Sequence, residues 1–170
     1  MSIADKCGCL PPAKRRTVLR EYIEAMRSLW TDEQAEYAGE FVKFGPSWAW
    51  PKPKQSHVPV LIGASGTDKT FEWIAKNADG WITTPRDEGI VESISRLQST
   101  WTANGREGAP RVVALDIRPD TDRLEQWRAG GVTDVLYGLP DKDEDQIGGY
   151  LDRLTDKLAD LRGEPVPTPG

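Results

Sequence analysis

The sequence is poor in the residues that build disulfide frameworks and metal centres. Among 170 residues it contains two cysteines, Cys7 and Cys9, and one histidine, His57. The single residue between the cysteines is too short a spacing for an ordinary disulfide, and a Cys/His zinc site cannot be completed. We therefore expect neither a disulfide scaffold nor a metal site, and His57 is expected to be a loop residue rather than a catalytic one.

The sequence also lacks an excess of positive charge and any long apolar run. Its formal net charge is -5, whereas a nucleic acid or an anionic membrane attracts a basic surface. No run approaches the length of a membrane span, and the N-terminus has no apolar signal core. Together with the sparse cysteines, this predicts a cytoplasmic globular protein without nucleic-acid or membrane partners.

What the sequence does contain is a regular alternation of apolar runs and amphipathic patterns. Buried-type strands are predicted at residues 58–62, 81–84, 111–117 and 132–137, and helices at 68–77, 87–103, 120–129 and 143–161. Four strand–helix units in succession predict a parallel sheet covered by helices. A further amphipathic helix is predicted at 14–30 with no strand before it, followed by a short strand-like piece around Phe41-Val42 and a proline-rich link.

The short repeat favours a barrel over a large open sheet. Each unit spans roughly 20–30 residues, and a closed (β/α)8 barrel needs about eight units. The predicted fold class is therefore α/β, a partial (β/α)8 TIM barrel whose C-terminal four units are preceded by one helix; an open four-stranded sheet is the alternative. Residues 14–162 are assigned to this domain, and residues 1–13 and 163–170 are predicted to be disordered.

A glycine-containing turn, "GASGT" at residues 63–67, follows the first strand and opens a helix. Ligands of parallel α/β proteins gather at the C-terminal ends of strands, and free amides with a helix dipole suit a phosphate. Gly63 and Gly66 are expected to permit close approach and positive φ, and Ser65 and Thr67 can cap the helix or bind an anion. A capped turn without a ligand is an equally weighted alternative.

Two sharper nucleotide motifs are excluded at this turn. A P-loop needs glycine directly before its lysine, but Asp68 precedes Lys69. The dinucleotide fingerprint needs a glycine where this sequence has Ser65.

Several side chains near predicted strand ends are candidates for substrate contact. Asp116 and Arg118 flank the end of the third strand, and Tyr137 lies near the end of the last. A solvated strand end for the first two and core packing for Tyr137 are the more ordinary interpretations. Trp48 and Trp50 are expected to anchor the proline-rich link by packing.

Four segments in order resemble the luciferase-like monooxygenase superfamily, and most closely its branch that uses the deazaflavin coenzyme F420. They are "REYIEAMRSLWTDEQAEYAGEFVKF", "PKPKQSHVPVLIGASG", "IAKNADGWITT" and "AGGVTDVLYGLP". The resemblance covers roughly residues 14–162. It implies a (β/α)8 barrel that binds a flavin or deazaflavin at its C-terminal face, with F420 as the expected coenzyme and FMN as the alternative.

The resemblance also implies individual roles. The backbone amides of the turn after the fifth barrel strand would hold the coenzyme phosphate, and Thr83 and Thr84 would lie near the same end of the pocket. Here that turn consists of Gly63, Ala64, Ser65, Gly66 and Thr67. Ala64 stands where the family usually has a second glycine.

Length is the main departure from the family, whose members are about twice as long, as eight barrel units require. The absent strands would carry most ring contacts and the acid–base residues, so no catalytic residue is assigned. The chain is expected to be the C-terminal part of an oxidoreductase that performs hydride transfer or monooxygenation, inactive alone, and paired with an N-terminal half or with further copies of itself. The alternatives are a non-catalytic assembly module and an open α/β domain that binds a phosphorylated ligand at Gly63–Thr67.

Overall fold

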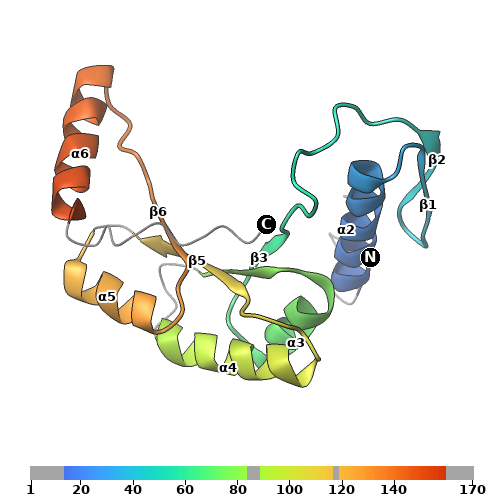
Figure 1. Cartoon of the computed structure of the whole chain (residues 1–170), viewed down its shortest axis with the longest axis horizontal. Helices are drawn as coiled ribbons and strands as arrows, with labels where there is room; N and C mark the ends of the chain where they lie inside the picture. The colour runs from blue at the N-terminus through green and yellow to red at the C-terminus, as the bar shows by residue number, and fades with distance from the viewer. Residues whose placement is uncertain (1–13, 84–88, 117–118, 160–170) are drawn as a thin grey trace, which may run out of the picture. The chain divides into compact units, whose positions relative to one another are not determined.

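The computed structural model describes residues 14–83, 89–116 and 119–159, which form five helices and six strands (Figure 1). The chain divides into two compact units, Met1–Val58 and Pro59–Gly170. The predicted disordered ends lie outside the described residues. None of the described helices has the length and hydrophobicity that a membrane span requires.

The first unit consists of a helix and a β-hairpin. Helix α2 covers Arg15–Thr31, close to the predicted 14–30. Strands β1 (Ala35–Ala38) and β2 (Lys43–Ser47) pair antiparallel. The strand predicted around Phe41-Val42 begins slightly later, at Lys43, and these two residues belong to the turn between β1 and β2.

The carboxylate of Glu21 holds this turn. Glu21 is 3% exposed, and its oxygens accept hydrogen bonds from the backbone amides of Glu40, Phe41 and Val42 at 3.0, 2.7 and 2.9 Å. Burial alone would raise the pKa of Glu21, but these amide bonds and nearby Arg20 bring the pKa below its ordinary value. Phe41 and Val42 therefore lie in a turn whose amides bind the buried Glu21 carboxylate, and they are not part of a strand.

The proline-rich link is not anchored by its tryptophans. Trp48 and Trp50 are each 65% exposed, so the packing expected of them is wrong. The ammonium of Lys52 instead donates to the carbonyl of Leu29 at 2.9 Å and also to that of Asp32. A cation at the C-terminal end of α2 satisfies carbonyls that the helix leaves open.

The second unit is built on a parallel sheet with strand order β3-β4-β5-β6. The strands are β3 (Leu61–Gly63), β4 (Gly80–Ile82), β5 (Arg111–Asp116) and β6 (Asp134–Tyr137). The helices that follow them are α3 (Asp68–Asn77), α4 (Ile90–Ala103), α5 (Thr121–Ala129) and α6 (Glu144–Lys157). The four predicted strand–helix units are confirmed, with β3 and β6 at the two edges of the described sheet.

Caps explain where the helices begin. Asp120 and Asp143 accept hydrogen bonds from the amides of Arg123 and Gln146, so α5 and α6 each start one residue after the predicted position. Helix α4 starts at Ile90, after a left-handed glycine with φ of 72°. Residues 87–88, where a start was predicted, lie outside the described residues.

One face of the sheet forms the core with α3 and α4. Trp81 pairs with Ile62 on one side and with Val112 on the other, so these three side chains point to the same face. Trp81 is fully buried and meets the ring of Phe71 edge-on, with centroids 5.2 Å apart. Ile74, Ile94, Leu97 and Ala114 complete the centre of this cluster.

We predict that Gly80→Ala destabilises the second unit by about 1–3 kcal/mol, because the sheet is already close-packed there. A methyl carbon at residue 80 would lie 2.0 Å from the carbonyl oxygen of Arg111 in β5. The matched control is Gly63→Ala in the same sheet, where the nearest atom would be 4.0 Å away. Urea unfolding measures both variants, and equal midpoints would contradict the prediction.

Candidate functional site

The turn at residues 63–67 lies at the C-terminal end of β3 and leads directly into α3. Thr67 is the N-cap of α3, and its hydroxyl accepts a hydrogen bond from the amide of Thr70 at 3.2 Å. Ser65 and Thr67 are exposed. The turn is therefore accessible, at the strand end where α/β proteins bind ligands.

The glycines of this turn serve close approach and not left-handed backbone. The positive φ expected for Gly63 and Gly66 is wrong: among the described residues, positive φ occurs only at glycines 89, 105, 108 and 131. A Cβ at residue 66 would lie 3.1 Å from both Phe71 and Trp81. Gly66 thus lets the turn rest directly on the aromatic core.

Two carbonyl groups of the turn are bound by side chains from the body of the second unit. The indole Nε1 of Trp81 donates to the carbonyl of Ala64 at 2.7 Å. The guanidinium of Arg96, on α4, donates through Nη2 to the carbonyl of Gly66 at 2.9 Å. Both bonds fix the orientation of peptide groups that would otherwise be free to rotate.

The remaining groups of the turn leave donors open. The carbonyl of Ser65 accepts from the amide of Thr67 at 2.8 Å, so all three central carbonyls have an internal donor. No acceptor in the described part of the chain takes a hydrogen bond from the amides of Ser65 or Gly66. A turn with satisfied acceptors and open donors is suited to an anion.

Thr83, expected near the same end of the pocket, faces the helices. It follows β4 on the same face as Trp81 and is fully buried. Its amide donates to the carbonyl of Val113 at 2.9 Å, while its hydroxyl has no hydrogen-bond partner within residues 14–83, 89–116 and 119–159. Thr84 and Arg118 lie outside the described residues. The binding roles of these residues stay predictions.

The structure brings Asp116 and Tyr137 together, with an arginine that sequence reasoning missed. Asp116 and Tyr137 are paired across β5 and β6, on the face that α3 and α4 cover elsewhere. Arg123 Nη2, from α5, donates to the two carboxylate oxygens of Asp116 at 3.0 and 2.8 Å. Its guanidinium lies 5.3 Å from the ring of Trp127. No motif marks Arg123, because this contact arises only when α5 folds back on the sheet.

Burial and the nearby Asp116 raise the pKa of Tyr137 to about 12. Removing the phenolic proton would place a second negative charge beside the carboxylate in a partly desolvated position. Tyr137 is therefore neutral at physiological pH. The substrate roles predicted for Asp116 and Tyr137 are not tested by this geometry and stay predictions.

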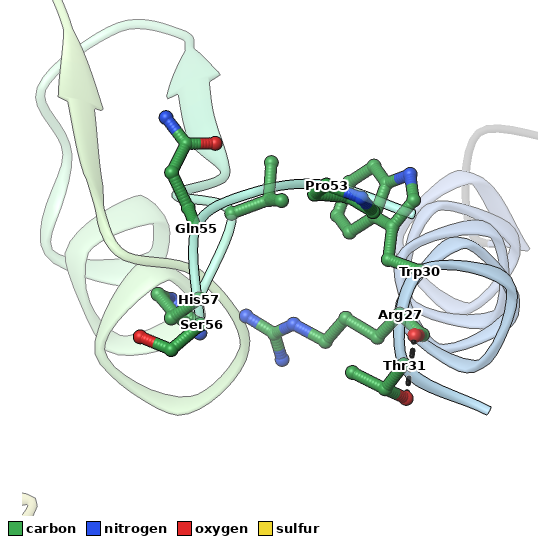
Figure 2. Close-up of a pocket in the computed structure, with 8 residues that line it drawn as sticks. Arg27, Trp30, Thr31, Pro53, Gln55, Ser56 and His57 are labelled. Atoms are coloured by element: carbon green, nitrogen blue, oxygen red, sulfur yellow. Dashed lines mark hydrogen bonds between the residues drawn. The ribbon is translucent and has the colours of Figure 1, made fainter. Parts of the chain in front are cut away.

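A separate cavity of about 110 Å³ lies within the first unit (Figure 2). The guanidinium of Arg27 points toward the loop segment that carries Ser56 and His57. The remaining lining residues are Trp30, Thr31, Pro53, Gln55 and Val58. His57 is an exposed loop residue, as predicted. No group of three or more metal-binding side chains occurs in the described part of either unit.

The parallel sheet with sequential strand order and the turn with open donors at a strand end place the second unit among α/β proteins. The family described as luciferase-like monooxygenase matches residues 3–126 of this chain. The chain belongs to this family.

Curated relatives share the sequence over much of this chain. An uncharacterized protein of Mycobacterium tuberculosis is 61% identical over 150 residues, which are 88% of this chain and 53% of that protein. The pyrimidine monooxygenase RutA of Serratia proteamaculans is 25% identical over 158 residues, 86% of this chain and 42% of that protein. The chain thus spans about half the length of the curated relatives it matches.

Solved structures share the fold. An F420-dependent secondary alcohol dehydrogenase in complex with an F420-acetone adduct superposes with a TM-score of 0.61 at 14% identity, covering 81% of this chain and 60% of that one. The monooxygenase RslO1 of Streptomyces bottropensis gives 0.52 at 19% identity, with 88% and 46% covered. At these identities the likeness concerns the fold alone, and it confirms the predicted class of an α/β protein that corresponds to part of a TIM barrel.

We predict that Tyr137→Phe reduces the loss of stability at alkaline pH. The pKa of Tyr137 is about 12 in the folded protein and about 10 when unfolded, so unfolding releases its proton between these values. Its contribution to stability is present below pH 10 and is lost as the pH rises toward 12. Tyr37, whose pKa is also raised to about 12, contributes similarly and remains in the variant.

The measurement is the free energy of unfolding in urea at several pH values between about 8 and 11.5, a window set by the tyrosine pKa. The control is Tyr22→Phe, since Tyr22 is 55% exposed. If Tyr137→Phe and Tyr22→Phe show the same pH slope as the unmodified chain, Tyr137 is not held neutral by the fold.

Proposed function

We propose that this chain supplies the coenzyme-phosphate site of a flavin- or deazaflavin-dependent oxidoreductase of the luciferase-like family, with F420 as the preferred coenzyme and FMN as the alternative. The observation that carries the proposal is the turn at Gly63–Thr67. Its central carbonyls are bound internally, while the amides of Ser65 and Gly66 have no acceptor among the described residues. Family membership supports the same assignment.

The donor set of the turn fits a phosphate group. Two backbone amides, the hydroxyl of Ser65 and the N-terminal dipole of α3 all favour negative charge at one place. The methyl group of Ala64 leaves less space for the phosphate than a glycine would. The hydroxyl of Thr67 is already used as the N-cap of α3. When bound, the coenzyme ring would exchange a hydride with a substrate carbon or activate oxygen for monooxygenation. The residues of this chain would bind and orient the coenzyme's anionic tail.

The side chains predicted to face substrate fit a supporting role better than acid–base chemistry. Asp116 is ion-paired with Arg123, and Tyr137 is neutral beside it. We therefore propose that Asp116 and Tyr137 shape the strand-end region, and that proton transfer is performed by residues outside this chain. The substrate contact predicted for Arg118 remains part of the proposal. No catalytic residue is assigned among the residues the structure describes.

We further propose that turnover requires additional strands beside β3 and β6. These edges have no neighbouring strand within the described sheet, and a parallel (β/α)8 barrel needs about eight strands to close. An N-terminal half of the same type of barrel, on the same or a second polypeptide, would complete the sheet. Without it, we expect little or no turnover of a small organic substrate.

The same edges favour a second candidate, a non-catalytic assembly module. Open edges of a parallel sheet are templates for pairing with another chain, including another copy. Light scattering over a range of protein concentrations separates the candidates. A stable monomer at every concentration would contradict edge pairing between copies and leave the coenzyme proposal standing.

We predict that the chain binds FMN and F420 more tightly than riboflavin, which has the flavin ring but no phosphate. Ring fluorescence during titration measures the three affinities, with the chain alone and after mixing with the N-terminal half of a family member. Equal affinity for FMN and riboflavin, or binding of neither coenzyme under both conditions, would reject the phosphate site.

Gly66→Leu is expected to weaken FMN binding by about tenfold or more, the equivalent of one charge-assisted hydrogen bond. The larger side chain would push the turn off Phe71 and Trp81. Gly148→Leu in α6 is the control, because a Cβ there meets nothing within 4 Å. Unchanged FMN affinity in Gly66→Leu, with an unchanged far-UV circular dichroism spectrum, would mean that the turn only connects β3 to α3.

A further inference from the structure

We propose that Trp81 and Arg96 are positioning residues for the phosphate site. They hold the carbonyl groups of Ala64 and Gly66 against the body of the second unit, so that the amide of Ser65 is presented to the anion and the carbonyl of Gly66 is kept away from it. This inference rests on the proposed function and adds to it two residues that orient the peptide groups of the turn without contacting the phosphate.

Trp81 fixes the first peptide group of the turn. Its side chain is fully buried, and its indole donates to the carbonyl of Ala64 at 2.7 Å. In a trans peptide the C=O and the N–H of one plane point in opposite directions. With the Ala64 carbonyl directed at the core, the amide of Ser65 in the same plane points away from it.

Arg96 fixes the last carbonyl. Its guanidinium donates to the carbonyl of Gly66 at 2.9 Å, to Ser93 Oγ at 3.2 Å and to Asp68 Oδ1 at 2.7 Å. It also lies 5.5 Å from the ring of Phe71. A planar guanidinium with partners on several sides has one favoured orientation. Without it, the Gly66 carbonyl could rotate toward the ligand and bring a partial negative charge against the phosphate.

The geometry assigns Arg96 an orienting role more than a direct electrostatic one. Its charge is paired with Asp68, and the two side chains are 43% and 84% exposed, so solvent screens their field. Lysine at residue 96 would keep the charge but lose the planar fork of donors. We therefore expect Arg96→Lys to restore only part of the binding that Arg96→Met loses.

The test follows backbone amide resonances of the full chain by NMR while inorganic phosphate is added. In the unmodified chain, the Ser65 and Gly66 amides should shift saturably. Arg96→Met should weaken phosphate binding by about tenfold, the effect of one charge-assisted hydrogen bond. The control Arg111→Met removes a different ion pair, with Asp134 at 2.9 Å, and should change the affinity by less than about twofold.

A companion variant separates orientation from charge. Removing Arg96 leaves the Asp68 carboxylate without this partner near the site, which by itself would repel phosphate. The double variant Arg96→Met/Asp68→Asn removes that repulsion, and the weakened binding should persist in it. Recovery of the original affinity in the double variant would overturn the orienting role.

Trp81→Phe provides a second test, because phenylalanine keeps an aromatic ring in the core but cannot donate to Ala64. It should also weaken phosphate binding and alter the Ser65 amide resonance in the free protein. If Arg96→Met, Trp81→Phe and Arg111→Met all bind phosphate as the unmodified chain does, the positioning inference is wrong and the phosphate site stands. If the Ser65 and Gly66 amides of the unmodified chain do not respond to phosphate, both the site and the inference are rejected.

Discussion

The burial of Trp81 in the middle of the parallel sheet is the constraint on which the second unit depends. Its ring lies on the helix-covered face, against Phe71 and between its neighbours in β3 and β5. The indole cannot be buried without a partner for its N–H, since an unsatisfied buried donor is costly. The carbonyl of Ala64 provides that partner. The same contact that completes the core therefore fixes the start of the turn, so packing and site geometry are not independent in this protein.

The burial of Trp81 also determines which polar groups the turn exposes. Gly66 rests on the aromatic core where a side chain would not fit, and its carbonyl is held by Arg96. What the turn offers to solvent is then mainly backbone N–H, at the N-terminus of a helix. Such a surface favours an anion without any cationic side chain in direct contact. This makes the proposed phosphate site compatible with a chain whose net charge is negative.

The chain belongs to the luciferase-like monooxygenase family while spanning about half the length of the curated relatives it matches. Its four-stranded sheet carries the proposed anchoring point for a coenzyme tail, but Asp116 at a neighbouring strand end is ion-paired within the fold. In the proposed arrangement, coenzyme anchoring and proton transfer would be performed at different strand ends. We propose that this chain binds the coenzyme phosphate and that residues on other strands transfer protons.

The sequence by itself determined the order of strands and helices, the helix at 68–77 and the location of the glycine turn. These follow from local periodicity and capping, which neighbouring residues encode. Tertiary structure decided the rest. The Glu21 carboxylate holds Phe41 in the hairpin turn before β2, Arg123 contacts Asp116, and Arg96 contacts the carbonyl of Gly66. Each of these contacts joins a polar side chain to a group on another element. Local sequence patterns do not predict such contacts, because they form only when the helices pack.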